Sequence, residues 1–399
     1  MTDAPRLTDA LRVREFRALW LSGLISRLGD QFARVALAVL AYDLTGSAAI
    51  TTLTYALTLV PNLLGGPLLG GLADRFPRRR LMIVCDLARA ALVGLMAVPG
   101  VPFPLLCALV FCATLLDSPE RTARIATTPD VLGKDLYQTG VTLLGLTSQV
   151  MVLAGLGAGG LILAVVPPRA GLLANAASFV LAALLVARSV KDRPAARTGR
   201  AVSPGELLIG VRLVLGDARL RSLLGLALLA AFYIAPEGLA VPYNAQLGGG
   251  GPQLALLLCA IPAGSVLGMF LVNRLRVGLD ALGPLALCSC LPLTVCAFAS
   301  GAVLPVAAWF LTGLLASYQV LANAEYVRIA PDERRGQVIG VAQSALIAAQ
   351  GLGVLVSGPL ADRFGPAAAV ATYGVAGTLV ALPLARAWRR SRQGGSEGA

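Results

Sequence analysis

The sequence predicts an all-α integral membrane protein with two pseudo-symmetric bundles of six transmembrane helices. Hydrophobic residues make up 57% of its 399 residues and charged residues only 14%, whereas a soluble domain carries about 25% charged residues. The mean hydropathy is +0.77. The apolar runs are continuous over about 20 residues and do not alternate with polar ones, which favours helices over barrel strands. We therefore expect the chain to cross a membrane many times.

Twelve apolar runs are long enough to span a bilayer, and Pro or Gly marks many of their ends. A polar stretch at 190–220, which contains KDRPAARTGR, divides these runs into two sets of six. We expect an N-terminal bundle over 1–189, a cytoplasmic linker over 190–220, and a C-terminal bundle with a cytoplasmic tail over 221–399. The expected spans are 16–41, 48–71, 81–99, 103–122, 140–165, 169–189, 221–244, 253–273, 282–300, 303–327, 337–361 and 367–388.

The distribution of Lys and Arg predicts the orientation of these spans. If both termini lie inside, the outer loops hold only Arg169 and Arg363 out of 33 basic residues. This arrangement satisfies the positive-inside rule, so we expect a multi-pass protein of the cytoplasmic membrane with both termini in the cytoplasm. Trp309 and Trp388 lie near span ends and are expected in an interfacial aromatic belt.

Composition and missing motifs exclude several classes of protein. The net charge of +12 does not indicate nucleic-acid binding, because the Arg residues separate apolar runs and form no single solvated face. The chain has no His and no phosphate-binding loop, so we expect no metal, no cofactor, no ATP hydrolysis and no enzyme activity. Seven Cys lie in apolar segments and are expected to fill the core. The expected partners of the monomer are membrane lipid, protons and a small-molecule substrate.

The most informative motif is GGLADRFPRRRLM at 70–82, which lies between two apolar runs. It suits a short cytoplasmic loop, and it resembles the loop 2–3 signature of the major facilitator superfamily of secondary transporters. The resemblance implies that Asp74 latches the cytoplasmic side in one state, with the helix start near Gly336 as its partner. Pro77 stands where the family has Gly. A plain positive-inside anchor is the alternative, but it does not explain Asp74. The expected gate residues are Gly70, Asp74, Arg75, Arg78, Arg79, Asp86 and Arg89.

The N-terminal part of the chain also resembles one subgroup of this superfamily. Phe16–Trp20, Leu28-Gly29-Asp30, Leu44–Ala48 and the pair Asp86 and Arg89 are similar to macrolide and siderophore exporters of the drug:proton antiporter type. Asn175–Phe179 fits the same subgroup more loosely. The resemblance implies proton-coupled export.

Glycines of the fifth span are similar to the antiporter signature of that span. Gly155, Gly159 and Gly160 fit it, but Leu156 stands where the signature has Pro. Small residues at this spacing also occur in any closely packed pair of transmembrane helices. Both interpretations stay open.

Charged residues inside the apolar spans are the candidates for proton and substrate binding, because a charge near the bilayer centre costs several kcal/mol. Arg27, Asp30 and Arg34 share one face of the first span at i−3 and i+4. A structural ion-pair cluster is the alternative. Glu237 lies between Pro236 and Gly238 in a span that these residues are expected to break. Alternatively, Glu237 is solvated at the outer end of that span.

Two further groups of charges have a structural interpretation. Asp86 and Arg89 are expected to brace the Arg-rich loop. Four charged residues form a turn at the inner end of the fourth span and are interpreted as gate or interface pairs. GPLADRF at 358–364 repeats part of the gate motif, but it falls on the opposite membrane face and is interpreted as a helix-end coincidence or a habit of the family. The charged turn consists of Asp117, Glu120, Arg121 and Arg124.

These features predict a secondary active transporter that works by alternating access, with residues 1–189 rocking against 221–388. Proton-coupled export of drug-like or secondary-metabolite molecules is the preferred function. A lipid, lysophospholipid or siderophore translocator is the alternative within transport, and a non-transporting membrane sensor or interaction protein is the alternative from another class. The acidic residues suit amphipathic cations, whereas Arg27 and Arg34 suit anions.

Overall fold

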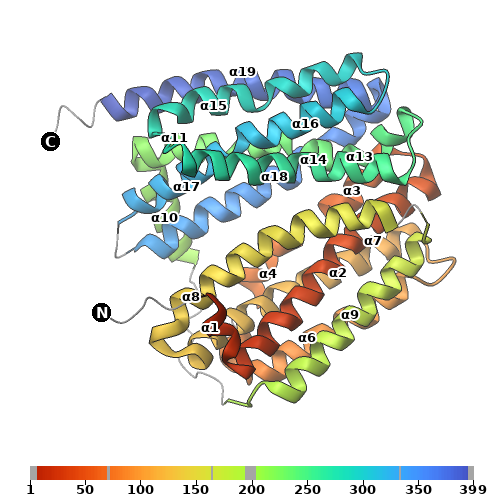
Figure 1. The fold of residues 1–399 in the computed structure, drawn as a ribbon, viewed down its shortest axis with the longest axis vertical. Helices are drawn as coiled ribbons and strands as arrows, with labels where there is room; N and C mark the ends of the chain where they lie inside the picture. Colours follow the sequence, from red (N-terminus) through yellow and green to blue (C-terminus); the bar gives the residue numbers. More distant parts are fainter. Residues whose placement is uncertain (1–6, 70–71, 163–164, 194–203, 332–333, 394–399) are drawn as a thin grey trace. The chain divides into compact units, whose positions relative to one another are not determined.

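The computed structural model describes residues 7–69, 72–162, 165–193, 204–331 and 334–393. Within these ranges the chain forms α-helices and two 3₁₀ helices, and it contains no strand there (Figure 1). The predicted all-α fold is confirmed. The long apolar runs have this form because a helix satisfies its own backbone hydrogen bonds in a membrane.

The chain divides into two compact units. Unit 1 comprises Met1–Leu40 and Leu57–Ala201, and unit 2 comprises Ala41–Ala56 and Val202–Ala399. The segment Ala41–Ala56 therefore groups with unit 2, although it was expected in the N-terminal bundle. The helices from the first half of the chain are α1 (Leu7–Arg12), α2 (Arg14–Thr45), α3 (Ala48–Ala56), α4 (Pro61–Leu69), α5 (Leu72–Arg75), α6 (Arg78–Met96), α7 (Phe103–Leu115), α8 (Asp117–Ile162) and α9 (Pro168–Ser189).

The second half of the chain supplies the remaining helices, all in unit 2. They are α10 (Pro204–Gly216), α11 (Ala218–Leu228), α12 (Ala230–Tyr233), α13 (Ala235–Gln246), α14 (Gly251–Arg274), η1 (Leu279–Ala281), α15 (Leu282–Ser289), η2 (Leu291–Phe298), α16 (Val303–Ala316), α17 (Tyr318–Ile329), α18 (Arg335–Phe364) and α19 (Pro366–Gln393).

Nine helical stretches of the described chain are long and apolar enough to cross a membrane. The three other expected spans coincide with α2, α6 and the second part of α8. Arg27, Asp30 and Arg34 interrupt the apolar run of α2, and charged residues interrupt α6 in the same way. The multi-pass character is thus established, and the full count of twelve spans stays a prediction.

The core of unit 1 forms where α2, α6, α7 and α9 meet, and α6 and α9 run side by side (Figure 1). Leu37 of α2, Met96 of α6, Leu109 of α7 and Leu172 of α9 are all buried in one cluster. Phe179 of α9 belongs to the same cluster. This core fixes α2 and α6, two of the three helices that carry the buried charges described below.

Glycines of the expected fifth span bring α8 close to α2. A Cβ atom at Gly155 would lie 2.5 Å from Cβ of Gln31, and one at Gly159 would lie 3.1 Å from Cγ2 of Val35. Gly160 is also buried. These glycines therefore act as close-packing positions between two helices.

A bend divides α8 into two parts. Gly133 has φ 64° and ψ −177°, a conformation that glycine adopts at little cost. Pro129 lies one turn earlier, inside the helix. The first part of α8 continues a 31-residue apolar stretch, Phe103–Gly133, that begins with α7. The bend separates the expected fourth and fifth spans.

The expected seventh span is interrupted, as its Pro and Gly residues predict. It consists of α11, α12 and α13, and the interruptions fall at Leu229 and Ile234. Pro236 lies in the first turn of α13, where a missing N–H removes no hydrogen bond. The short helix α12 thus connects two longer helices within the 29-residue stretch Ala218–Gln246.

Trp309 and Trp388 do not form the expected interfacial belt, because both are buried inside unit 2. The ring of Trp309 stacks on that of Tyr243 with centroids 6.0 Å apart. The Tyr243 hydroxyl donates a hydrogen bond to the carbonyl of Cys296 at 3.0 Å. Helix packing, which the linear pattern does not reveal, decides the position of these rings.

The expected linker at 190–220 contains a helix, α10. Val214 of α10 is buried in the core cluster of unit 2, which anchors the helix. Asp217 then caps α11, since its side chain accepts hydrogen bonds from the amides of Arg219 and Leu220. The apolar run within the linker explains why this stretch folds onto unit 2.

Candidate functional site

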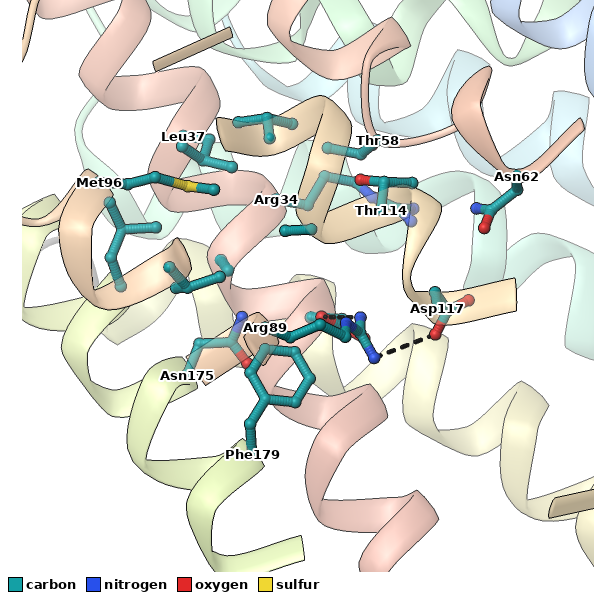
Figure 2. Close-up of a pocket in the computed structure, with 16 residues that line it drawn as sticks. Arg34, Leu37, Thr58, Asn62, Arg89, Met96, Thr114, Asp117, Asn175 and Phe179 are labelled. Carbon is teal, nitrogen blue, oxygen red and sulfur yellow. Dashed lines mark hydrogen bonds and ion pairs between the residues drawn. The ribbon is translucent and has the colours of Figure 1, made fainter. Parts of the chain in front are cut away.

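Arg89 is the centre of a buried ion-pair network in unit 1. Its Nη2 donates to both carboxylate oxygens of Asp30, at 3.1 Å to Oδ1 and 2.9 Å to Oδ2. Its Nη1 lies 3.1 Å from Oδ1 of Asp117. The guanidinium also lies 4.2 Å from the centroid of the Phe179 ring. One buried cation therefore serves two carboxylates and one aromatic face (Figure 2).

Three helices position this network. Asp30 lies on α2, Arg89 on α6, and Asp117 is the first residue of α8. A side chain at position 29 would collide with Asn175 and Ser178 of α9, so Gly29 lets α9 approach α2 next to Asp30. The two sequence segments that resemble the exporter subgroup, around Asp30 and around Asn175, thus meet in space.

A small cavity opens onto the network. Its volume is about 90 Å³, and its lining includes Asp30, Arg34, Arg89 and Asp117 (Figure 2). A site for a drug-sized ligand has about 300–1,000 Å³, whereas one water needs only about 10–15 Å³ of such volume. The cavity thus has room for water molecules and not for a drug-like substrate.

A larger cavity lies beside the first part of α8, also within unit 1. Its volume is about 510 Å³, which falls in the range of small-molecule sites. Three guanidinium-bearing residues line it, namely Arg27 of α2 and Arg121 and Arg124 of α8. Trp20 and Tyr137 add aromatic surface. Helices α2 and α8 contribute lining residues to both cavities. The larger cavity therefore lies against two of the three helices that carry the ion-pair network.

The charged turn of the fourth span is divided between these two cavities. Asp117 pairs with Arg89, and Glu120 pairs with Arg124 through bonds from Nε and Nη2. Nη1 of Arg124 also donates to the carbonyl of Leu19 at 2.5 Å. Asp117, Glu120 and Arg124 therefore belong to internal networks of unit 1, whereas Arg121 is exposed.

Asp86, one turn before Arg89, is fully buried. Neither of its carboxylate oxygens has a hydrogen-bond partner among the described residues. The charges that act on it are Glu120 and Arg124 of α8, Arg89 of its own helix, and Asp30 of α2. Both Asp86 and Arg89 were expected to brace the Arg-rich loop. Arg89 forms two ion pairs, whereas the carboxylate of Asp86 has no hydrogen-bond partner among the described residues.

Replacing Asp86 by Leu is expected to leave the free energy of unfolding unchanged or to raise it by about 1–4 kcal/mol, because a buried carboxyl group without hydrogen bonds is costly. Reversible unfolding in mixed micelles measures this change. The matched control is Asp117→Leu, which removes an ion-pair partner of Arg89 and should destabilise the protein. A marked loss of stability in Asp86→Leu would instead support the bracing role.

The Arg-rich loop is held by two neighbouring helices. Arg78 donates from Nη1 to the carbonyl of Ala126 at 2.7 Å and to Oδ2 of Asp130 at 2.8 Å. Arg79 donates to the carbonyl of Ala187 near the end of α9. Arg75 is exposed. Gly70 and the side chain of Asp74 lie outside the described part of the chain, so the expected Asp74 latch stays a prediction.

Glu237 is buried in unit 2, so the alternative of a solvated carboxylate is wrong. The hydroxyl of Tyr55, on α3, donates to its Oε2 at 2.8 Å. Tyr55 is itself buried. The sequence indicated Glu237 but not Tyr55, because 182 residues separate the two.

Asp362, in the repeated GPLADRF segment, caps the N-terminus of α3 within unit 2. Its carboxylate accepts hydrogen bonds from the amides of Ala48 and Ala49 at 2.6 and 3.1 Å, and from the Ser47 hydroxyl at 2.7 Å. Interpreting the repeat as a coincidence missed this role. The repeated motif was the available signal, because it carries an acidic residue, Asp362. An acidic side chain at a helix N-terminus, here that of α3, is stabilising.

The apolar helices and their enclosed ion pairs define a multi-pass membrane transport protein. Comparison with known proteins gives the family: the model of the Major Facilitator Superfamily matches residues 19–300. The chain belongs to this superfamily, and it is a transporter and not an enzyme. It is similar to the uncharacterised MFS-type transporter YvqJ of Bacillus subtilis (strain 168), with 28% identity over 286 residues that cover 68% of this chain and 67% of the relative.

Solved structures show the same fold. The nucleoside transporter NupG has a TM-score of 0.74 at 14% identity, covering 93% of this chain and 98% of its own. A bacterial homologue of the human lysosomal transporter Spinster has a TM-score of 0.71 at 14% identity, covering 95% and 97%. The POT family transporter PepTSo has a TM-score of 0.72 at 14% identity, covering 95% of this chain and 98% of its own. These likenesses confirm the fold and leave the substrate open.

Proposed function

We propose that this chain is a proton-coupled exporter of drug-like or secondary-metabolite molecules that works by alternating access. The observation that carries the proposal is the Asp30–Arg89–Asp117 network, which joins three helices of unit 1 and opens onto a water-sized cavity. Intramembrane carboxylates of this kind mark proton and substrate pathways in transporters.

In this network, a proton and the Arg89 guanidinium can compete for the carboxylate of Asp30. The Arg89 side chain is only 5% exposed, whereas those of Asp30 and Asp117 are 30% and 27% exposed. A proton that reaches Asp30 neutralises one of the two carboxylates that share the guanidinium. Arg89 is then held by Asp117 alone, and the contact between α2 and α6 weakens. Loss of that proton restores the contact.

The same helices connect the proton site to the larger cavity. On α2, Arg27 lies one turn from Asp30, and on α8, Arg121 lies one turn from Asp117. A change in the contact between α2 and α6 thus reaches the residues that line the larger cavity. This connection is the physical basis for coupling proton binding to substrate release.

Direction and substrate type rest on the resemblance of the N-terminal segments to drug:proton antiporters. We propose a monomer in the cytoplasmic membrane with both termini in the cytoplasm, since the basic residues then follow the positive-inside rule. Membrane lipid surrounds it, and protons and a small molecule are its ligands. A lipid or siderophore translocator is the second candidate, because basic side chains line the larger cavity.

Accumulation of fluorescent dyes in an efflux-deficient bacterium tests the proposal. Cells with the wild-type chain should accumulate less dye than cells without it, and a protonophore should abolish the difference. Asp30→Asn should abolish it as well, because a neutral amide cannot exchange a proton. Asp43→Asn, on the exposed end of the same helix, is the matched control and should export dye normally.

Other outcomes contradict the proposal in distinct ways. Full export by Asp30→Asn together with loss of export by Glu237→Gln would move the proton site to unit 2. Equal dye accumulation in all cells, with membrane expression confirmed, would contradict drug export. A null result for lipid and siderophore flux as well would favour the non-transporting sensor.

A further inference from the structure

We infer that the 510 Å³ cavity of unit 1 binds an amphipathic organic anion, with an acidic group held by Arg27 and Arg121 and an apolar body against the aromatic wall. The inference deepens the proposed function by naming the chemical class of the substrate. It rests on the charge, neighbours and lining of this cavity.

The charge of the cavity wall is positive. Its lining contains three Arg and no Asp or Glu among the described residues. One of the three, Arg124, is neutralised by Glu120 and also bonded to the hydroxyl of Ser22 at 2.6 Å. Arg27 and Arg121 add two further guanidinium groups to this lining, so an anion fits the wall electrostatically and a cation does not.

Arg27 and Arg121 also repel one another. The charged groups near Arg27 include the like charges of Arg121 and Arg124 and the opposite charges of Asp117 and Glu120. Arg121 is exposed, and no ion pair to it occurs among the described residues. A bound carboxylate, phosphate or sulfonate would relieve this repulsion and accept charge-assisted hydrogen bonds from both guanidinium groups.

The rest of the cavity is suited to an apolar body. Its other lining residues are mainly aromatic or aliphatic, and Trp20 is fixed by a hydrogen bond from its Nε1 to Thr147 at 3.0 Å. Gly23 leaves space for Arg124 against α2, because a Cβ there would lie 3.1 Å from Nη1 of Arg124. The cavity therefore presents a rigid ring beside two cations, which is the pattern expected for an aromatic or long-chain acid.

Two xanthene dyes of similar size and opposite charge provide the test: fluorescein, an anion, and rhodamine 123, a cation. Fluorescence anisotropy measures their binding to the full-length protein in nanodiscs without a proton gradient. We expect fluorescein to bind at least about tenfold more tightly than rhodamine 123. Arg27→Gln and Arg121→Gln should each weaken fluorescein binding about tenfold, which corresponds to about 1.4 kcal/mol per lost charge-assisted contact.

Three controls keep the result interpretable. Arg212→Gln, on the exposed surface of α10 in unit 2, should bind fluorescein as the wild type does. Arg121→Lys, which keeps the positive charge, should retain part of the affinity, and gel filtration confirms that each variant is folded. Inorganic phosphate should compete at least tenfold more weakly than fluorescein, because it lacks the apolar body.

Tighter binding of rhodamine 123, or unchanged fluorescein binding in the double variant Arg27→Gln and Arg121→Gln, would overturn the inference. Equal competition by inorganic phosphate would overturn its amphipathic part. Fluorescein binding to the wild-type protein, measured in nanodiscs without a proton gradient, separates this inference from the proposed function, because it does not require proton-coupled transport. Failure of proton coupling with intact anion binding would contradict only the proposed function.

Discussion

Replacing Arg89 by Gln is expected to abolish transport and to lower the free energy of unfolding by about 3–5 kcal/mol, because it leaves carboxylates in unit 1 without their buried cation. Arg89 is the shared partner of Asp30 and Asp117, and its side chain is 5% exposed. Dye export in cells and reversible unfolding of the purified protein measure the two effects.

A triple variant separates the two effects of this substitution. Arg89→Gln combined with Asp30→Asn and Asp117→Asn removes the uncompensated charges, so it should regain most of the lost stability and still fail to transport. A single variant as stable as the wild type at neutral pH would show that the ion pairs contribute little to folding.

The second large effect is expected at the contact between α14 and α16, which lie side by side in unit 2 (Figure 1). A Cβ atom at Gly264 would collide with the backbone carbonyl of Phe310, and one at Gly313 with that of Ile261. Because backbone atoms cannot move aside like a flexible side chain, Gly264→Leu should destabilise the protein by at least about 3 kcal/mol. Thermal unfolding in detergent measures the loss.

Gly340→Ala is the matched control for this prediction. Gly340 lies inside α18 with open space around its Cβ position, so Ala there should stabilise the helix by about 0.5–1 kcal/mol. If Gly264→Leu unfolds at the wild-type temperature, the close approach of α14 and α16 does not contribute to stability.

Much of the fold was predictable from composition. The long apolar runs, the broken helix around Pro236 and the glycines of the fifth span each follow from local chemistry. The linker was less predictable, because α10 forms there only when Val214 enters the core of unit 2. The burial of Trp309 was also hard to predict from the sequence, because its ring packs on Tyr243 from a distant helix.

The candidate site was also predictable only in part. The residue types in the spans identified Asp30 and Glu237 as costly intramembrane charges, whereas Arg89 was interpreted as a brace for the Arg-rich loop. Their partners were not identified, since the guanidinium that binds Asp30 lies 59 residues away. Arg27 and Arg34, at i−3 and i+4, were the expected neighbours of Asp30. Helix periodicity shows only which residues share a face of one helix, and not which residues of other helices lie opposite that face.

By itself, the sequence determined that this protein is a multi-pass helical membrane protein, because apolar length and charge frequency depend on local composition alone. The transporter type was indicated by the resemblance of its motifs to a known family. Only the tertiary structure decided that Arg89 joins Asp30 to Asp117, that Asp86 has no hydrogen-bond partner among the described residues, and that Asp362 caps α3. Each of these facts depends on contacts between helices that are far apart in the chain, and helix packing sets those contacts.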